Sequence, residues 1–358
     1  MFAAILDCDE PRERPLSSMV ASSASEAEAP AVPILEACCD SRESVRNAVA
    51  GGASRVEVCG RGSLGVGGLT PSPTLVQLCL GECAASGTEV VALVRVRCGN
   101  FVYCREEIEE MCLEIRSLRR AGCRAFALGC LTGDGCIDAE ATTTLVAAAR
   151  APVRGAAPDD LEFEADDGVT IVFHRAIDEV LRQTTNLKRM HALAADLRRL
   201  GVDRVLSSGG APTARGGRST LWALHKACAR ADVGLCLAAG VTAASAPVLL
   251  ADTGAAELHA NSSLCEDVPR GNPVDLFFAS EKVVSEAKCR TFVVELEAAS
   301  RRRRTLPPRT ESDGDLKQGL DHLALGDKQQ QQGVPHASPY FASFCEAFTM
   351  PRSAWPLL

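Results

Sequence analysis

The chain has 358 residues, of which 46% are hydrophobic, and a formal net charge of −8. This charge argues against a nucleic-acid partner, because nucleic-acid-binding domains usually carry a basic surface. No apolar run approaches the roughly 18 residues that a membrane span needs, and the N-terminal residues lack the basic flank and apolar core of a secretory signal. We therefore expect a cytoplasmic protein without nucleic-acid or membrane partners.

The two ends of the chain differ in composition from its middle. Residues 1–32 are rich in Ser, Ala, Glu and Pro without hydrophobic periodicity, which predicts a disordered extension. From residue 301 onward an Arg run, a Gln run and scattered Pro predict a disordered, low-complexity tail. Residues 33–300 carry the patterns of one folded domain, interrupted by an acidic surface insertion at about 153–168.

The folded domain opens with a predicted β-α-β unit. Two apolar runs, ILEAC and RVEVC, flank a helix. We expect Asp40 to cap its N-terminus in a capping box with Glu43, and Gly51 with Gly52 to end it. Strands that are joined by one helix run parallel.

The two strands of this unit share a Glu-x-Cys pattern. Glu36 and Cys38 alternate in the first strand as Glu57 and Cys59 do in the second. Because side chains alternate between the faces of a strand, all four point to one face. If the strands are neighbours and in register, Cys38 meets Cys59 and Glu36 meets Glu57.

Strands and helices continue to alternate to about residue 299. Eight such units in about 230 residues favour a closed (β/α)8 barrel, an α/β fold of the TIM type, over a doubly wound sheet. The later predicted helices cover residues 105–122, 138–150, 186–200, 221–230, 243–251 and 285–299.

The predicted strand ends are unusually polar. Sites in this fold lie at the carboxyl ends of the strands. Each polar residue alone has an ordinary structural explanation, such as a buried Glu–Arg pair. Together they predict a site, because each unpaired buried charge costs several kcal/mol. The residues are Glu36, Cys38, Glu57, Cys59, Arg95, Arg97, His174, Arg175, Asp178, Glu257 and His259, with turns at Ser207–Gly210 and Ala238–Gly240.

Seven motifs in order resemble the CutC family, which is named for copper homeostasis. The resemblance covers about residues 34–261, and the chain departs from it at Asn100, where the family usually has Asp. It implies a TIM-barrel-like fold, an intracellular role in copper tolerance or trafficking, and Cu(I) binding by Cys38 and Cys59. Thiolates suit this soft ion. The motifs are LEACC, RVEVC with GGLTPS, GNFVY, G-x-L-x-x-DG-x-ID, FHRAID, RVLSSGG and ELH.

Seventeen cysteines are many for a chain of this length. In the absence of a secretory signal, reduced thiols are favoured over a disulfide framework. The sequence contains no Cys-x-x-Cys pair, so zinc-finger and thioredoxin-like sites have little support.

Two functions remain open. The first is a cytosolic copper homeostasis protein that holds Cu(I) between Cys38 and Cys59. The second is a barrel enzyme, a hydrolase, lyase or isomerase, acting on a small anionic or sugar-like metabolite. Its acid–base residues would surround one pocket, and backbone N–H groups in the turns would hold an anion such as phosphate. These residues are Glu36, Glu57, Arg95, His174, Asp178 and His259, with Ser208, Gly209, Gly210 and Gly240 as the anion-binding turns.

Other features narrow the choice of partner and chemistry. The expected partners are a copper ion and a small anionic ligand, and a homo-oligomer is compatible with the sequence. A Schiff-base aldolase is disfavoured, because none of the six lysines stands at a predicted strand end.

Overall fold

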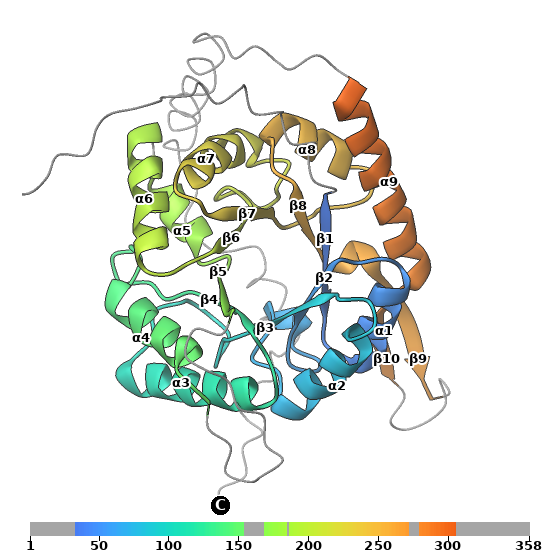
Figure 1. Cartoon of the computed structure of the whole chain (residues 1–358), viewed down its shortest axis with the longest axis horizontal. Helices are drawn as coiled ribbons and strands as arrows, with labels where there is room; N and C mark the ends of the chain where they lie inside the picture. Colours follow the sequence, from blue (N-terminus) through green and yellow to red (C-terminus); the bar gives the residue numbers. More distant parts are fainter. Residues whose placement is uncertain (1–32, 154–167, 185, 272–278, 306–358) are drawn as a thin grey trace, which may run out of the picture. The chain divides into compact units, whose positions relative to one another are not determined.

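The computed structural model describes residues 33–153, 168–184, 186–271 and 279–305. Within them eight parallel strands close into a barrel in chain order, so the predicted (β/α)8 fold is confirmed. Figure 1 shows the strands at the centre and the helices around them. The strands are β1 (Ile34–Cys39), β2 (Arg55–Val58), β3 (Glu89–Leu93), β4 (Ala125–Leu128), β5 (Thr170–Phe173), β6 (Arg204–Ser207), β7 (Gly234–Leu237) and β8 (Glu257–Ala260).

Helices connect successive strands and cover the outside of the barrel (Figure 1). The helices are α1 (Arg42–Ala50), α2 (Pro73–Cys83), α3 (Arg105–Arg120), α4 (Ala139–Arg150), α5 (Ile177–Arg182), α6 (Leu187–Arg199), α7 (Arg218–Arg230), α8 (Ala246–Thr253) and α9 (Glu286–Thr305), with 3-10 turns η1 (Leu64–Val66) and η2 (Ser262–Leu264). No helix in the described ranges is both long and apolar enough to cross a membrane.

Strand alternation divides the core into two parts. Cys39 and Val58 belong to the large cluster that packs the strands against the helices. Their neighbours Cys38 and Cys59 belong to a smaller cluster with residues such as Leu206, from the other side of the barrel. The Glu-x-Cys pattern therefore points into the barrel, as alternation predicts.

The start of α1 differs from the prediction. Its N-cap is Ser41, whose hydroxyl accepts a hydrogen bond from the Ser44 N–H at 3.2 Å. Asp40 stands one residue earlier, and its carboxylate instead accepts from the Gly62 N–H at 2.9 Å. Both residues are good caps, and Ser41 takes the position because its own backbone is extended directly before the first helical residue. The predicted capping box of Asp40 with Glu43 is therefore wrong.

A β-hairpin after the barrel was not predicted. Its antiparallel strands are β9 (Cys265–Arg270) and β10 (Ala279–Val284). The hairpin attaches to α1, because the Asn47 side chain donates to the Val284 carbonyl at 2.9 Å. Helix α9 then continues to Thr305, so the arginine run predicted to open the tail lies in the helix. The predicted disordered ends, at 1–32 and from 306 onward, and nearly all of the acidic insertion lie outside the described residues.

Candidate metal centre

The site forms where the first strand meets both of its neighbours. Strand β1 pairs with β2 on one side and with β8 on the other, which closes the barrel. Cys38 stands opposite Glu57, whereas Glu36 stands opposite Arg55 on β2 and opposite His259 on β8. The strands are thus offset by two residues from the predicted register, because strands in a closed barrel are tilted and staggered.

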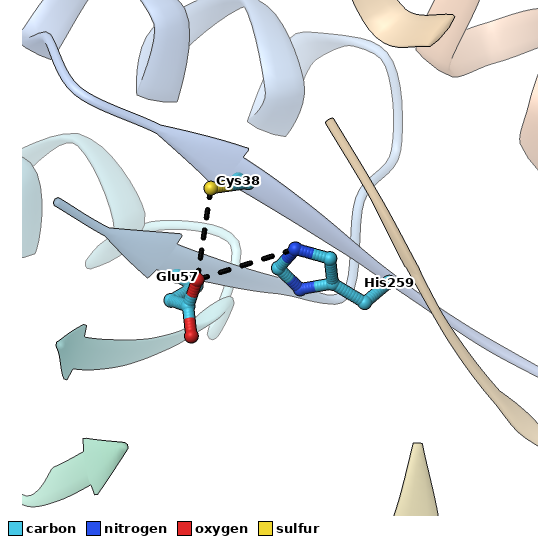
Figure 2. A group of neighbouring side chains, drawn as sticks. All are labelled: Cys38, Glu57 and His259. Atoms are coloured by element: carbon cyan, nitrogen blue, oxygen red, sulfur yellow. Dashed lines mark hydrogen bonds and ion pairs between the residues drawn. The ribbon is translucent and has the colours of Figure 1, made fainter. Parts of the chain in front are cut away.

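Despite the offset, the two predicted cysteines meet inside the barrel. Their Sγ atoms are 3.8 Å apart, and both residues are buried. The Cys38 thiol donates to the Glu57 carboxylate at 3.6 Å, and His259 Nε2 lies 4.0 Å from the same oxygen. Figure 2 shows Cys38, Glu57 and His259 converging from β1, β2 and β8. Their possible ligand atoms all lie within 4.8 Å of one another.

A buried ion-pair network supports the histidine from behind. His259 Nδ1–H donates to Glu36 at 2.7 Å, which leaves Nε2 facing the cysteines. Glu36 is in turn bound by the Nε–H of Arg55, and Arg55 also pairs with Glu257. A carboxylate behind a histidine fixes the ring and its tautomer, as is usual for metal-binding histidines.

The sequence interpretation missed Arg55. It stands at the start of β2, whereas sites in this fold are expected at the carboxyl ends of the strands. Its guanidinium is almost completely buried. Residues 55, 57 and 59 share the same strand phase, so alternation from Cys59 back through Glu57 places Arg55 inside the barrel. This strand periodicity is the feature of the sequence that could have identified Arg55 as a residue of the barrel interior.

The surroundings of the two cysteines keep their thiols protonated. For Cys38, the contact with Cys59 and burial both raise the thiol pKa well above its usual value. For Cys59, the contact with Cys38 lowers the pKa, but burial and the charge of Glu57 outweigh it and raise the pKa. Both thiols must therefore lose a proton before they bind a metal as thiolates.

The pKa values of the two buried carboxyl groups, Glu36 and Glu57, are shifted in opposite directions. Burial acts to raise the pKa of Glu36, but Arg55 and His259 hold it well below its usual range. Burial raises the pKa of Glu57. The charge of His259 acts to lower this pKa, but the charge of Glu36 raises it further, and the pKa remains above its usual value. Burial acts to lower the pKa of His259, but contacts with Cys38 and Glu36 and the charge of Glu57 raise it.

Arg95 and His174 have structural contacts of their own. Arg95 donates to the carbonyls of Val66, Gly68 and Gly99, and so joins two loops of the barrel mouth. His174 Nδ1 accepts from a backbone N–H at 3.2 Å. Burial, followed by the charge of Arg95, lowers the pKa of His174 to about 3.

Asp178 holds the predicted anion-binding turn. Its carboxylate accepts from the N–H groups of Ser208 and Gly210, at 2.9 Å and 3.1 Å, and from the Ser207 hydroxyl. The Gly209 N–H donates to Ser207 Oγ at 2.9 Å. These N–H groups already have partners, so an anion could use them only by displacing side-chain oxygens.

The predicted acid–base residues therefore fall into two groups. Hydrogen bonds and ion pairs join Glu36, Glu57 and His259 to the cysteines. Within the described ranges, none joins Arg95, His174 or Asp178 directly to that cluster. One common pocket for all six remains a prediction.

A comparison with protein families decides the relationship. The model of the CutC family matches residues 33–264, which include every residue of the cluster. The chain belongs to the CutC family. The resemblance read from the motifs is thus confirmed.

Known relatives of the CutC family align with most of the barrel. A CutC family protein from Porphyromonas gingivalis is 34% identical over 239 residues, 66% of this chain and 82% of the relative. One from Rhizobium meliloti is 32% identical over 266 residues, 74% of this chain and 96% of the relative. A crystal structure of CutC from Streptococcus agalactiae is similar to this chain, with a TM-score of 0.54 and 25% identity, covering 63% of this chain and 97% of that one.

Proposed function

We propose that this member of the CutC family binds Cu(I) in the cytoplasm, with Cys38 and Cys59 as thiolate ligands and His259 as the third ligand. The observation that carries the proposal is the pair of Sγ atoms 3.8 Å apart, with an imidazole beside them inside the barrel. Two thiolates and one imidazole form a soft donor set that suits Cu(I).

The sulfur separation favours a bent site over a linear one. If metal–sulfur bonds are about 2.3 Å long, as in zinc thiolates, sulfurs 3.8 Å apart subtend about 110° at the ion. A linear pair would need a separation of about 4.6 Å with the same bonds. A bent pair leaves room for a third ligand, and His259 Nε2 is oriented for that place by the bond from Nδ1–H to Glu36.

Glu57 is the local proton acceptor for metal binding. The Cys38 and Cys59 thiols both donate to its Oε2 atom, at 3.6 Å and 3.9 Å. When a thiol binds the metal as a thiolate, the proton that it loses can pass to this carboxylate. Carboxylate oxygen is a hard donor that suits Cu(I) less than sulfur or imidazole does, so Glu57 serves the cysteines and is not a ligand itself.

A reducing compartment is consistent with the thiols. All 15 cysteines among the described residues are free. Disulfides are rare in cytosolic proteins. This supports the cytoplasmic assignment and keeps Cys38 and Cys59 available for copper.

The test is a competitive Cu(I) titration against a chelator under reducing conditions. Cys38→Ser and Cys59→Ser should each weaken the tightest site by at least about 100-fold, the equivalent of ~2.7 kcal/mol. Cys39→Ser is the matched control, because Cys39 is buried on the outer face of the same strand. Unchanged affinity in the Cys38 and Cys59 variants would contradict the proposal.

A second candidate is catalysis at the barrel mouth. It is favoured by His174, whose Nε2 is buried and has no hydrogen-bond partner among the described residues. Since Nδ1 accepts a backbone N–H, Nε2 carries the proton and can donate to a substrate. An unbiased metabolite-depletion screen tests this. If it finds a substrate, His174→Ala should abolish turnover and leave Cu(I) affinity intact; consumption of no metabolite would contradict catalysis.

A further inference from the structure

A pocket borders the proposed metal centre but does not contain the cysteines. It has a volume of about 380 Å³, within the range of small-molecule sites. It is lined by the loops that follow β7 and β8, the position where many barrels of this fold bind phosphate groups. His259 lies on its wall, and Arg175, from the loop after β5, also lines it.

Arg175 is held as a preorganised cation. Its Nε–H donates to Asp178 at 2.9 Å and one Nη2–H donates to Ser208 Oγ at 3.0 Å. A guanidinium has five N–H groups, so three remain without a partner among the described residues. The Asp178 carboxylate also accepts hydrogen bonds from four other donor groups of Ser207, Ser208 and Gly210. Its negative charge is therefore stabilised by several donors and not by Arg175 alone. The side chain keeps 45% of its surface exposed.

The backbone of the same pocket adopts an uncommon conformation. Ala239 has a φ of +74°, one of two non-glycine residues with positive φ in the described chain. Gly240 follows with a φ of +65°. Non-glycine residues in this region are strained and concentrate at ligand sites. The Ala239 carbonyl accepts from the Ala214 N–H at 2.9 Å, which holds the turn in place.

We propose that this pocket binds a small metabolite through a phosphate or carboxylate group, with Arg175 as its charged contact. Arginine matches both groups because its planar guanidinium offers parallel N–H donors. The pocket is larger than one oxyanion needs, so the rest of the ligand occupies the space beside His259. This inference goes beyond copper binding and does not depend on it.

Calorimetry on the metal-free, full-length protein tests the site. The probes are inorganic phosphate, glycerol 3-phosphate and malonate, each titrated at constant ionic strength. At least one should bind saturably, and Arg175→Gln should weaken it by at least about tenfold, because a charge-assisted hydrogen bond is lost. Arg182→Gln is the matched control, since Arg182 is an exposed arginine nearby that does not line the pocket; its affinity should equal that of the wild type.

A second variant keeps the proposal testable if Arg175→Gln does not fold, because that substitution removes the bond from Arg175 to Asp178. Ser262→Leu puts a larger side chain at an exposed position of the pocket wall and leaves the contacts of Arg175 intact. It should also weaken binding. No binding of any probe to the wild type, or wild-type affinity in a folded Arg175→Gln or Ser262→Leu variant, would overturn the proposal. Cu(I) titration of the same variants should show unchanged affinity, which separates this claim from the metal site.

Discussion

Glu36 and Glu57 carry the same side chain on neighbouring strands but have opposite surroundings. Arg55 and His259 stabilise the Glu36 carboxylate, whereas Glu57 lies buried beside two thiols. The pKa of Glu36 is therefore lowered and that of Glu57 is raised. A lowered carboxyl pKa stabilises the fold above the unfolded value near 4.3, whereas a raised one destabilises it as pH rises through the folded pKa.

The same substitution should thus have opposite effects at the two positions. At pH 7, Glu36→Gln should lower the free energy of unfolding by about 3 kcal/mol, because Arg55 loses its most deeply buried partner and keeps only its partly exposed pairs with Glu257 and Glu89. Glu57→Gln should raise it by about 1 kcal/mol, because a buried charge is removed. Urea unfolding of the metal-free protein measures both. As the pH falls through the raised pKa of Glu57, the advantage of Glu57→Gln should shrink, because Glu57 itself takes up a proton. Equal effects of the two substitutions at pH 7 would contradict the assignment.

The protonated thiols make Cu(I) binding dependent on pH. Because the pKa values of Cys38, Cys59 and His259 are raised, their protons leave only when the metal binds. Apparent affinity should therefore increase with pH between 6 and 8, by about tenfold per unit for each proton released to solvent. Calorimetry in buffers of different ionisation enthalpy counts these protons. A count of zero, with affinity independent of pH, would show that the thiols are already ionised.

At the scale of the elements, one glycine fixes how the first and last helices meet. Gly51 ends α1 against α9, and a Cβ there would lie 2.4 Å from the Cys289 Cβ and 2.7 Å from the Glu286 carbonyl. Gly51→Ala should lower the free energy of unfolding by about 2 kcal/mol through this overlap. Gly81→Ala is the control, because Gly81 lies in α2 with open space around it. It should stabilise by about 0.5–1 kcal/mol; a similar loss in both variants would refute the packing explanation.

The sequence predicts whole elements better than their registers. Alternating apolar runs and capping residues locate the strands and helices, as Asn186 does for α6. The offset between β1 and β2 depends on the tilt that closes the barrel, which no local pattern encodes. Likewise β9 and β10 are mostly exposed and polar, so they lack the hydrophobic alternation by which strands are recognised. Their attachment to α1 is a long-range contact.

At the scale of the molecule, barrel closure creates the proposed site. Cys38 and Cys59 come from the first two strands and His259 from the last, and they meet only because β1 pairs with β8. Glu-x-Cys periodicity predicts the thiols locally. The link from His259 to Glu36 and Arg55 crosses more than 200 residues of sequence. The sequence therefore predicts only that Glu36 and His259 lie at the same end of the barrel, and it does not predict their hydrogen bond or the ion pair with Arg55.

The most direct test is X-ray absorption spectroscopy of the reduced, full-length protein loaded with one equivalent of Cu(I). We expect two sulfur ligands and one imidazole nitrogen, with the nitrogen contribution lost in His259→Ala while both sulfurs remain. Loss of one sulfur in either Cys38→Ser or Cys59→Ser should accompany weaker binding. A spectrum without sulfur ligands, or one that the Cys38 and Cys59 substitutions leave unchanged, would contradict the proposal that these two cysteines hold copper.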